Sequence, residues 1–212
     1  LLTGESEKCV RIEKALRSSG ARVVSRMADL LLHETPPMLH VVIVLESSGA
    51  VSGVPECCDS VVAQIRELCR FAAIPSRLSV ITRSAMSIDQ QRICDPEQSA
   101  VIGLLKVAAL EHPELQIRQI DIAGEFDSEG VVEVLLAETQ EDVIAIHQGG
   151  FLVPRLHRFM PQPRQFAFDA RKSVLITGGF GGLGLRLGEW LADNGCRHLV
   201  LAGRTPPPQA AL

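Results

Sequence analysis

Residues 173–184 read Ser-Val-Leu-Ile-Thr-Gly-Gly-Phe-Gly-Gly-Leu-Gly, and this stretch decides the expected fold. It begins as a short apolar strand and becomes rich in glycine after Thr177. A helical pattern of apolar residues follows over 185–191, and a second apolar run begins at His198. A strand, a glycine turn, a helix and a second strand within about thirty residues are the setting in which a glycine fingerprint binds a dinucleotide.

The glycines of this turn have separate expected roles. Gly178 permits the tight turn, Gly182 lets the backbone approach a pyrophosphate, and Gly184 lets the helix pack close to the strand. The phosphates would lie at the positive N-terminus of the helix. The alternative is a glycine-rich turn of an α/β fold that binds nothing. The predicted cofactor-binding residues of the turn are Thr177, Gly178, Gly179, Phe180, Gly181, Gly182, Leu183 and Gly184.

The end of the second strand predicts which cofactor is used. Sites for NAD place an Asp or Glu near this point, where it binds the ribose 2′-hydroxyl. Here the strand ends in Gly203, Arg204 and Thr205, and no acidic residue follows. A guanidinium suits a 2′-phosphate, to which it donates two hydrogen bonds. The sequence therefore favours NADPH, with these three residues added to the predicted site.

Composition excludes several other classes of function. The net charge is −4 and no basic patch is visible, so a nucleic-acid partner is not expected. No segment approaches the roughly 20 apolar residues of a membrane span, and no secretory signal is visible, so we expect a cytoplasmic protein without a membrane partner. The six cysteines and six histidines show no spacing typical of a metal site, so none is predicted.

The chain reads as two α/β units in series. Strands and helices alternate over residues 1–159, including a short strand predicted at 21–25 and a longer one at 115–122. The proline-containing stretch 160–172 is the expected linker, and 173–212 begins a second unit. At the first turn of the first unit, Glu5, Ser6 and Glu7 stand where the second unit has glycines. Acidic side chains there would repel a pyrophosphate, so this unit is expected to bind no nucleotide.

In this order, the motifs resemble the ketoreductase domain of modular type I polyketide synthases. The match to the family's glycine fingerprint is the strongest. The similar stretches are Thr177–Gly184, Trp190–Leu191, His198–Arg204, Gly103–Glu114, Ile120–Asp121 and Pro154–Leu156.

The resemblance implies a fold and an activity. The fold is a truncated Rossmann-like parallel-sheet subdomain without cofactor (1–159), followed by the first βαβ segment of an NADP-binding Rossmann fold, a short-chain dehydrogenase/reductase. The activity is NADPH-dependent reduction of a β-ketoacyl chain on an acyl carrier protein, with neighbouring synthase domains and a possible homodimer as partners.

The sequence departs from the family's catalytic pattern. It contains no tyrosine, and the family's catalytic serine, tyrosine and lysine are expected beyond the second strand, so no catalytic residue is predicted and the 212-residue chain alone is expected to be inactive. Two alternatives remain open: an inactive scaffold derived from a ketoreductase, and an unrelated NADP-dependent dehydrogenase or epimerase.

Overall fold

The computed structural model describes residues 1–3, 6–25, 38–47, 54–70, 74–88, 94–160, 168–169 and 171–204. These residues divide into two compact units, Leu1–Leu156 and His157–Leu212. Most of the predicted linker 160–172 and the predicted site residue Thr205 lie outside the described residues. No helix in the described part of the chain has both the length and the apolar character needed to cross a bilayer.

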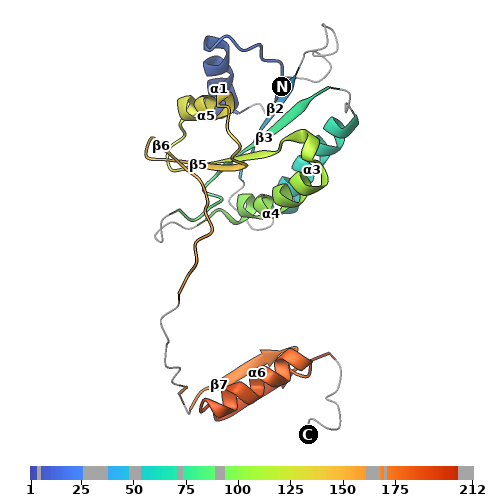
Figure 1. The fold of residues 1–212 in the computed structure, drawn as a ribbon, viewed down its shortest axis with the longest axis vertical. Coiled ribbons are helices and arrows are strands. Elements are labelled where there is room, and N and C mark those ends of the chain that lie inside the picture. The colour runs from blue at the N-terminus through green and yellow to red at the C-terminus, as the bar shows by residue number, and fades with distance from the viewer. Residues whose placement is uncertain are drawn as a thin grey trace. The chain divides into compact units, whose positions relative to one another are not determined.

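The first unit alternates strands and helices along the chain (Figure 1). Its elements are β1 (Leu2–Thr3), α1 (Glu7–Ser18), β2 (Leu39–Val44), α3 (Val54–Arg70), β3 (Ser76–Arg83), α4 (Pro96–Glu111), η2 (Pro113–Leu115), β4 (Arg118–Ala123), α5 (Ser128–Leu136), β5 (Val143–His147) and β6 (Gly150–Leu152). The strands form one sheet in the order β1-β2-β3-β4-β5-β6. The first five are parallel and β6 returns antiparallel, so the expected parallel α/β class is confirmed.

Helices cover both faces of this sheet (Figure 1). Helices α1 and α5 pack on one face, around Ile12 and Val131, and α3 and α4 pack on the other, around Val61 and Val101. The central strands must therefore be apolar on both sides, which is why β2 reads as an unbroken apolar run after His40.

The structure corrects two predicted strands. The segment 21–25 is no strand; the Val24 carbonyl accepts one hydrogen bond from the Leu2 amide (3.0 Å), at the edge of β1 opposite β2. The strand predicted at 115–122 begins only at Arg118, because Pro113–Leu115 forms a 3₁₀ turn and Gln116 has a left-handed φ of 43°. Apolar spacing alone did not reveal this turn.

The second unit is a βαβ unit built from β7 (Ser173–Thr177), α6 (Gly182–Asp193) and β8 (His198–Ala202). The strands are parallel, with Thr177 opposite Ala202, so both carboxyl ends meet at one edge. Buried Ile176, Leu191 and Cys196 form the core between helix and sheet.

The half-buried histidine of β2, His40, gives the first unit a predicted dependence on pH. The His40 ring lies 2.8 Å from the Ser79 hydroxyl, measured from Nε2 to Oγ. Burial, and then the positive charge of Arg77, lowers the pKa of His40 from 6.5 to about 3. The unfolded chain therefore binds a proton below pH 6.5 that the folded chain refuses until about pH 3, so stability falls as pH falls through this window, by about 1.4 kcal/mol per unit at most.

Urea denaturation of wild type and His40→Gln between pH 7 and 4, followed by circular dichroism, measures this effect. The variant should lose a large part of the slope below pH 6.5. The same slope in both proteins would assign the acid sensitivity to carboxylates instead.

Candidate functional site

The turn between β7 and α6 has the geometry of a glycine fingerprint. Gly178 adopts a left-handed φ of 68°, which L side chains rarely adopt. The Gly179 amide then donates to the Ala202 carbonyl of β8 (2.9 Å), and the Gly181 amide donates to the Gly178 carbonyl (3.0 Å). These bonds fix the turn against the end of the neighbouring strand.

Two further glycines are required by close packing. A Cβ on Gly184 would lie 2.6 Å from the Gly178 carbonyl oxygen, so the first turn of α6 rests directly on the backbone of the turn before it. A Cβ on Gly179 would lie 2.9 Å from the Leu201 Cβ of β8. The role of Gly184 in close packing was expected, although its contact is the turn rather than a strand; the contact of Gly179 was not.

The N-terminus of α6 is free of capping side chains. Its N-cap is Gly181, which supplies no side-chain acceptor, and no acidic residue lies in its first turn. A Cβ on Gly182 would meet nothing within 4 Å, so the backbone here borders open space. The first amides of a helix point outward with a partial positive charge, and this arrangement leaves them available to an anion.

The end of β8 adds a cation at the same edge. The residue directly after β8 is Gly203. A larger residue would not fit there, since a Cβ on Gly203 would lie 2.7 Å from the Phe180 ring. Sequence reasoning placed Phe180 in the site but did not foresee this packing, and the only signal was a glycine directly after the strand. Arg204 comes next and is exposed. Within the described residues, no acidic side chain forms an ion pair with it.

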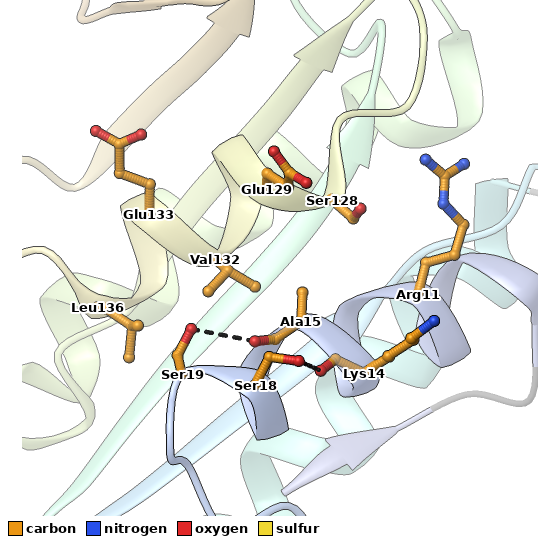
Figure 2. Close-up of a pocket in the computed structure, with 10 residues that line it drawn as sticks. All are labelled: Arg11, Lys14, Ala15, Ser18, Ser19, Ser128, Glu129, Val132, Glu133 and Leu136. Atoms are coloured by element: carbon orange, nitrogen blue, oxygen red, sulfur yellow. Dashed lines mark hydrogen bonds between the residues drawn. The ribbon is translucent and has the colours of Figure 1, made fainter.

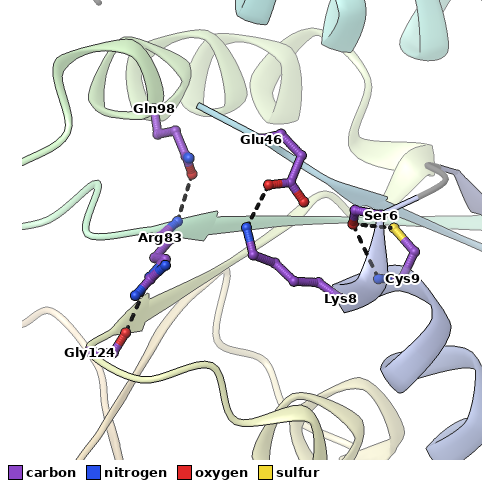
Figure 3. A network of polar contacts seen from close by, with 7 residues as sticks. All are labelled: Ser6, Lys8, Cys9, Glu46, Arg83, Gln98 and Gly124. Atoms are coloured by element: carbon purple, nitrogen blue, oxygen red, sulfur yellow. Dashed lines mark hydrogen bonds and ion pairs between the residues drawn. The ribbon is translucent and has the colours of Figure 1, made fainter. Parts of the chain in front are cut away.

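The corresponding edge of the first unit is already filled by its own polar groups (Figure 3). Ser6 caps α1 by accepting a hydrogen bond from the Cys9 amide (3.4 Å), and Glu7 lies in the first turn. Lys8 forms an ion pair with Glu46 beyond the end of β2, at 2.5 Å. Glu5 lies outside the described residues. A phosphate would meet an occupied helix N-terminus and two acidic groups here.

These contacts favour the charged form of the Glu46 carboxyl group. Partial burial raises the pKa of this carboxyl, but hydrogen bonds from Lys8 and Ser6 and the charges of Lys8 and Arg83 outweigh it, so the pKa lies below its ordinary value. The Arg83 side chain in turn donates to the Gly124 carbonyl (3.2 Å), and its amide donates to the Gln98 side chain (2.6 Å). The polar side chains at this edge are therefore already engaged in ion pairs and hydrogen bonds of the protein itself.

A groove of about 650 Å³ lies between α1 and α5 (Figure 2). Its walls carry Arg11 and Lys14 from α1 and Glu129 and Glu133 from α5. Among the described residues no ion pair links these charges across the groove, and the two helices are joined by apolar packing of residues such as Ile12 and Val132. The groove therefore offers no arrangement typical of a nucleotide site.

Both units are similar to domains of known proteins. A family model described as "Polyketide synthase extender module SpnB, Rossmann fold domain" matches residues 5–156, and the "KR domain" model matches residues 172–211. A phenolphthiocerol/phthiocerol polyketide synthase from Mycobacterium tuberculosis is 36% identical over 160 residues, which are 71% of this chain and 8% of that protein. The pikromycin synthase component PikAIII of Streptomyces venezuelae is 32% identical over 169 residues, which are 76% of this chain and 11% of that protein.

Solved structures show the same likeness. A C2-type ketoreductase from a modular polyketide synthase matches with a TM-score of 0.73 and 23% identity, covering 94% of this chain and 48% of that one. An A1-type ketoreductase matches with a TM-score of 0.71 and 26% identity, covering 94% and 47%. The chain thus spans about half the length of these ketoreductases and a small part of the synthases.

Proposed function

Since this chain belongs to the ketoreductase family of the modular polyketide synthases, we propose that it forms part of a reductase that uses NADPH to convert a β-ketoacyl chain on an acyl carrier protein to the β-hydroxyacyl form. One observation carries the proposal. The N-terminus of α6 has no side-chain cap and no acidic residue in its first turn. It follows a turn in which Gly178 and Gly179 are required by backbone conformation and close packing, and Arg204 lies two residues beyond the end of β8.

The residues of this edge have distinct proposed roles toward NADPH. The turn Gly178–Gly182 and the first amides of α6 hold the pyrophosphate, and Arg204, with Thr205, holds the 2′-phosphate. Thr177, Leu183, Gly184 and Gly203 support this surface, with Phe180 against Gly203. When bound, NADPH supplies the hydride; the residues described here bind and orient it.

The first unit has a structural role in this proposal. Its Ser6 cap and its Lys8–Glu46 ion pair occupy the edge where a nucleotide would bind, so residues 1–159 form a subdomain without cofactor, joined to the NADPH-binding unit through 160–172. The 212 residues contain no tyrosine to act as the proton donor. Reduction therefore needs residues from the rest of the ketoreductase, and this chain alone should reduce no ketone.

The proposed partners follow from the same family. They are the acyl carrier protein that presents the ketone, neighbouring synthase domains and, in the complete synthase, a second copy of the polypeptide. The two synthases compared above are much longer than this chain. A cytoplasmic location is part of the same proposal.

Arg204 provides the test. In the complete ketoreductase that contains this chain, Arg204→Ala should raise the KM for NADPH roughly ten- to a hundredfold, because one charge-assisted contact contributes about 1.5–3 kcal/mol. Use of NADH should change little, since NADH has no 2′-phosphate. Steady-state kinetics with both cofactors measures the difference.

Arg197 offers a matched control. It is exposed and immediately precedes β8, at the opposite end of the strand from Arg204. Arg197→Ala should leave both KM values unchanged. Equal losses with both cofactors in Arg204→Ala would refute the phosphate role, and a complete ketoreductase that binds NADPH without reducing any β-ketoacyl substrate would favour the inactive scaffold.

A further inference from the structure

Three side chains with metal-binding atoms meet at one corner of the first unit, away from the edge described above. Cys69 lies in the last turn of α3, His112 is the C-cap residue that follows α4, and Glu114 lies in η2. Their donor atoms all lie within 4.8 Å of one another. We propose that Cys69, His112 and Glu114 bind a single divalent cation of the zinc class.

Two of the three ligand separations are close to those of a metal centre, and the third lies within 4.8 Å. The Cys69 Sγ lies 3.6 Å from the His112 Nδ1, and this nitrogen lies 3.1 Å from the Glu114 Oε1. Tetrahedral zinc with Zn–S of ~2.3 Å and Zn–N or Zn–O of ~2.0–2.1 Å requires separations of about 3.6 Å between S and N and about 3.4 Å between N and O. The first distance agrees, and the second needs a shift of only a few tenths of an ångström.

The same distances argue against a thiol–histidine–acid relay. In such a relay the nucleophile and the acid lie on opposite nitrogens of the ring. Here the Cys69 Sγ is closer to Nδ1 (3.6 Å) than to Nε2 (4.0 Å), and Nδ1 is also the nitrogen beside Glu114. Both groups converge on one ring atom, as ligands around a shared centre do.

The corner holds its ligands in place through the backbone. The His112 amide donates to the Ala108 carbonyl (2.8 Å), and the His112 carbonyl accepts from the amide of buried Leu115 (3.1 Å). On the other side, Leu68 is buried next to Cys69 and anchors the end of α3. Both chain segments thus belong to the packed core between α3 and α4, and little rearrangement is needed for binding.

Charge and access also suit a divalent cation. A thiolate, a carboxylate and a neutral imidazole bring a total charge of −2, which balances the ion. The side chains of His112 and Glu114 are 34% and 57% exposed, so the ion reaches them from solvent and a water completes the tetrahedron. Binding forms the metal–sulfur bond and releases the thiol proton to solvent, with no change of oxidation state.

Sequence reasoning predicted no metal site because it searched for short motifs. Cys69 and His112 are 43 residues apart and meet only because α3 and α4 pack side by side. The ion would join the end of α3 to the corner between α4 and η2. Its expected effect is a raised thermal stability of the first unit.

Metal titration of the 212-residue chain tests the proposal. The protein is freed of metal with a chelator, kept reduced with a phosphine and titrated with Zn²⁺ by calorimetry and with Co²⁺ by absorption. We expect about one equivalent to bind with a Kd in the micromolar range, and a thiolate-to-cobalt charge-transfer band in the near ultraviolet. Absence of binding at metal concentrations of about 100 µM would overturn the proposal.

Variants identify the ligands. Cys69→Ser should remove the cobalt band, and His112→Gln and Glu114→Gln should each weaken Zn²⁺ binding by roughly tenfold or more. Cys58→Ser is the control, because Cys58 lies on the same helix outside the cluster and should leave the titration unchanged. Circular dichroism shows whether each variant is folded. A cobalt band that survives in folded Cys69→Ser, or that disappears in Cys58→Ser, would assign the metal to other cysteines and refute this site.

Discussion

Replacing Asp121 with alanine should lower the free energy of unfolding of the first unit by about 4 kcal/mol, because two buried donors and one half-buried donor would lose their acceptor. Asp121 lies on β4 and is completely buried. Its carboxylate accepts hydrogen bonds from the Thr82 hydroxyl (2.7 Å) and from the amides of Ala85 (2.9 Å) and Met86 (3.1 Å).

These bonds hold the turn that follows β3. Ser84 has a left-handed φ of 54°, a costly conformation for a residue with a side chain, and it lies directly before the two amides that Asp121 binds. The turn leads toward α4, whose N-cap Asp95 donates its amide to the Ser84 carbonyl (2.8 Å). Loss of the carboxylate would therefore release both the turn and the start of the helix.

Urea denaturation followed by circular dichroism measures the loss. Fluorescence would not, because the single tryptophan, Trp190, lies in the second unit and the chain has no tyrosine. Asp59→Ala is the matched control: Asp59 is exposed on α3, and its replacement should change stability by less than about 0.5 kcal/mol. A similar effect for the two variants would show that the hydrogen bonds of Asp121 contribute nothing special.

Elements with a strong apolar pattern could be predicted from the sequence, and Asp121 shows why other features could not. The run at 173–177 forms a strand, as its apolar and β-branched side chains predicted. Asp121 stands inside such a run, and only the resemblance to a family drew attention to it. Its three partners come from β3 and the following turn, so its role depends on pairing between strands that a linear pattern does not contain.

In the candidate site, too, local features could be predicted from the sequence, and contacts between distant residues could not. The left-handed Gly178 could be predicted because a tight turn after a strand needs it. The packing of Phe180 against Gly203 could not, since it joins two residues across the parallel strands. The Cys69–His112–Glu114 corner escaped prediction for the same reason.

The turn between the first strand and the first helix is capped by polar side chains in the first unit and left uncapped in the second. In the first, Ser6 caps the helix and Lys8 is neutralised by Glu46, so the positive end of α1 is already satisfied. In the second, Gly181 leaves the end of α6 without a side-chain acceptor. A glycine N-cap stabilises a helix by only a few tenths of a kcal/mol less than serine does, so leaving the end of α6 open to the proposed pyrophosphate costs little stability.

Gly182 and Gly184 allow the fold and the proposed site to be tested separately. Gly184→Ala should destabilise the second unit by about 2–3 kcal/mol, because the new methyl group would lie 2.6 Å from backbone atoms that have nowhere to move. Gly182→Ala should stabilise α6 slightly, by about 0.5 kcal/mol, since its methyl group meets nothing and alanine favours a helix. Trp190 fluorescence during urea denaturation of the 212-residue chain compares them, because this residue lies on α6.

Binding should show a different pattern from stability. In the complete ketoreductase, Gly182→Ala should weaken NADPH binding at least tenfold despite its sound fold, because the methyl group would occupy the space that the pyrophosphate needs. Gly188→Ala is the control: it lies on the same helix, and its methyl group would make only ordinary contacts, at 3.8 Å or more. Its NADPH affinity should equal that of wild type. Wild-type affinity in Gly182→Ala would mean that no phosphate approaches this turn, and the glycines would then serve only the packing of α6 on β7 and β8.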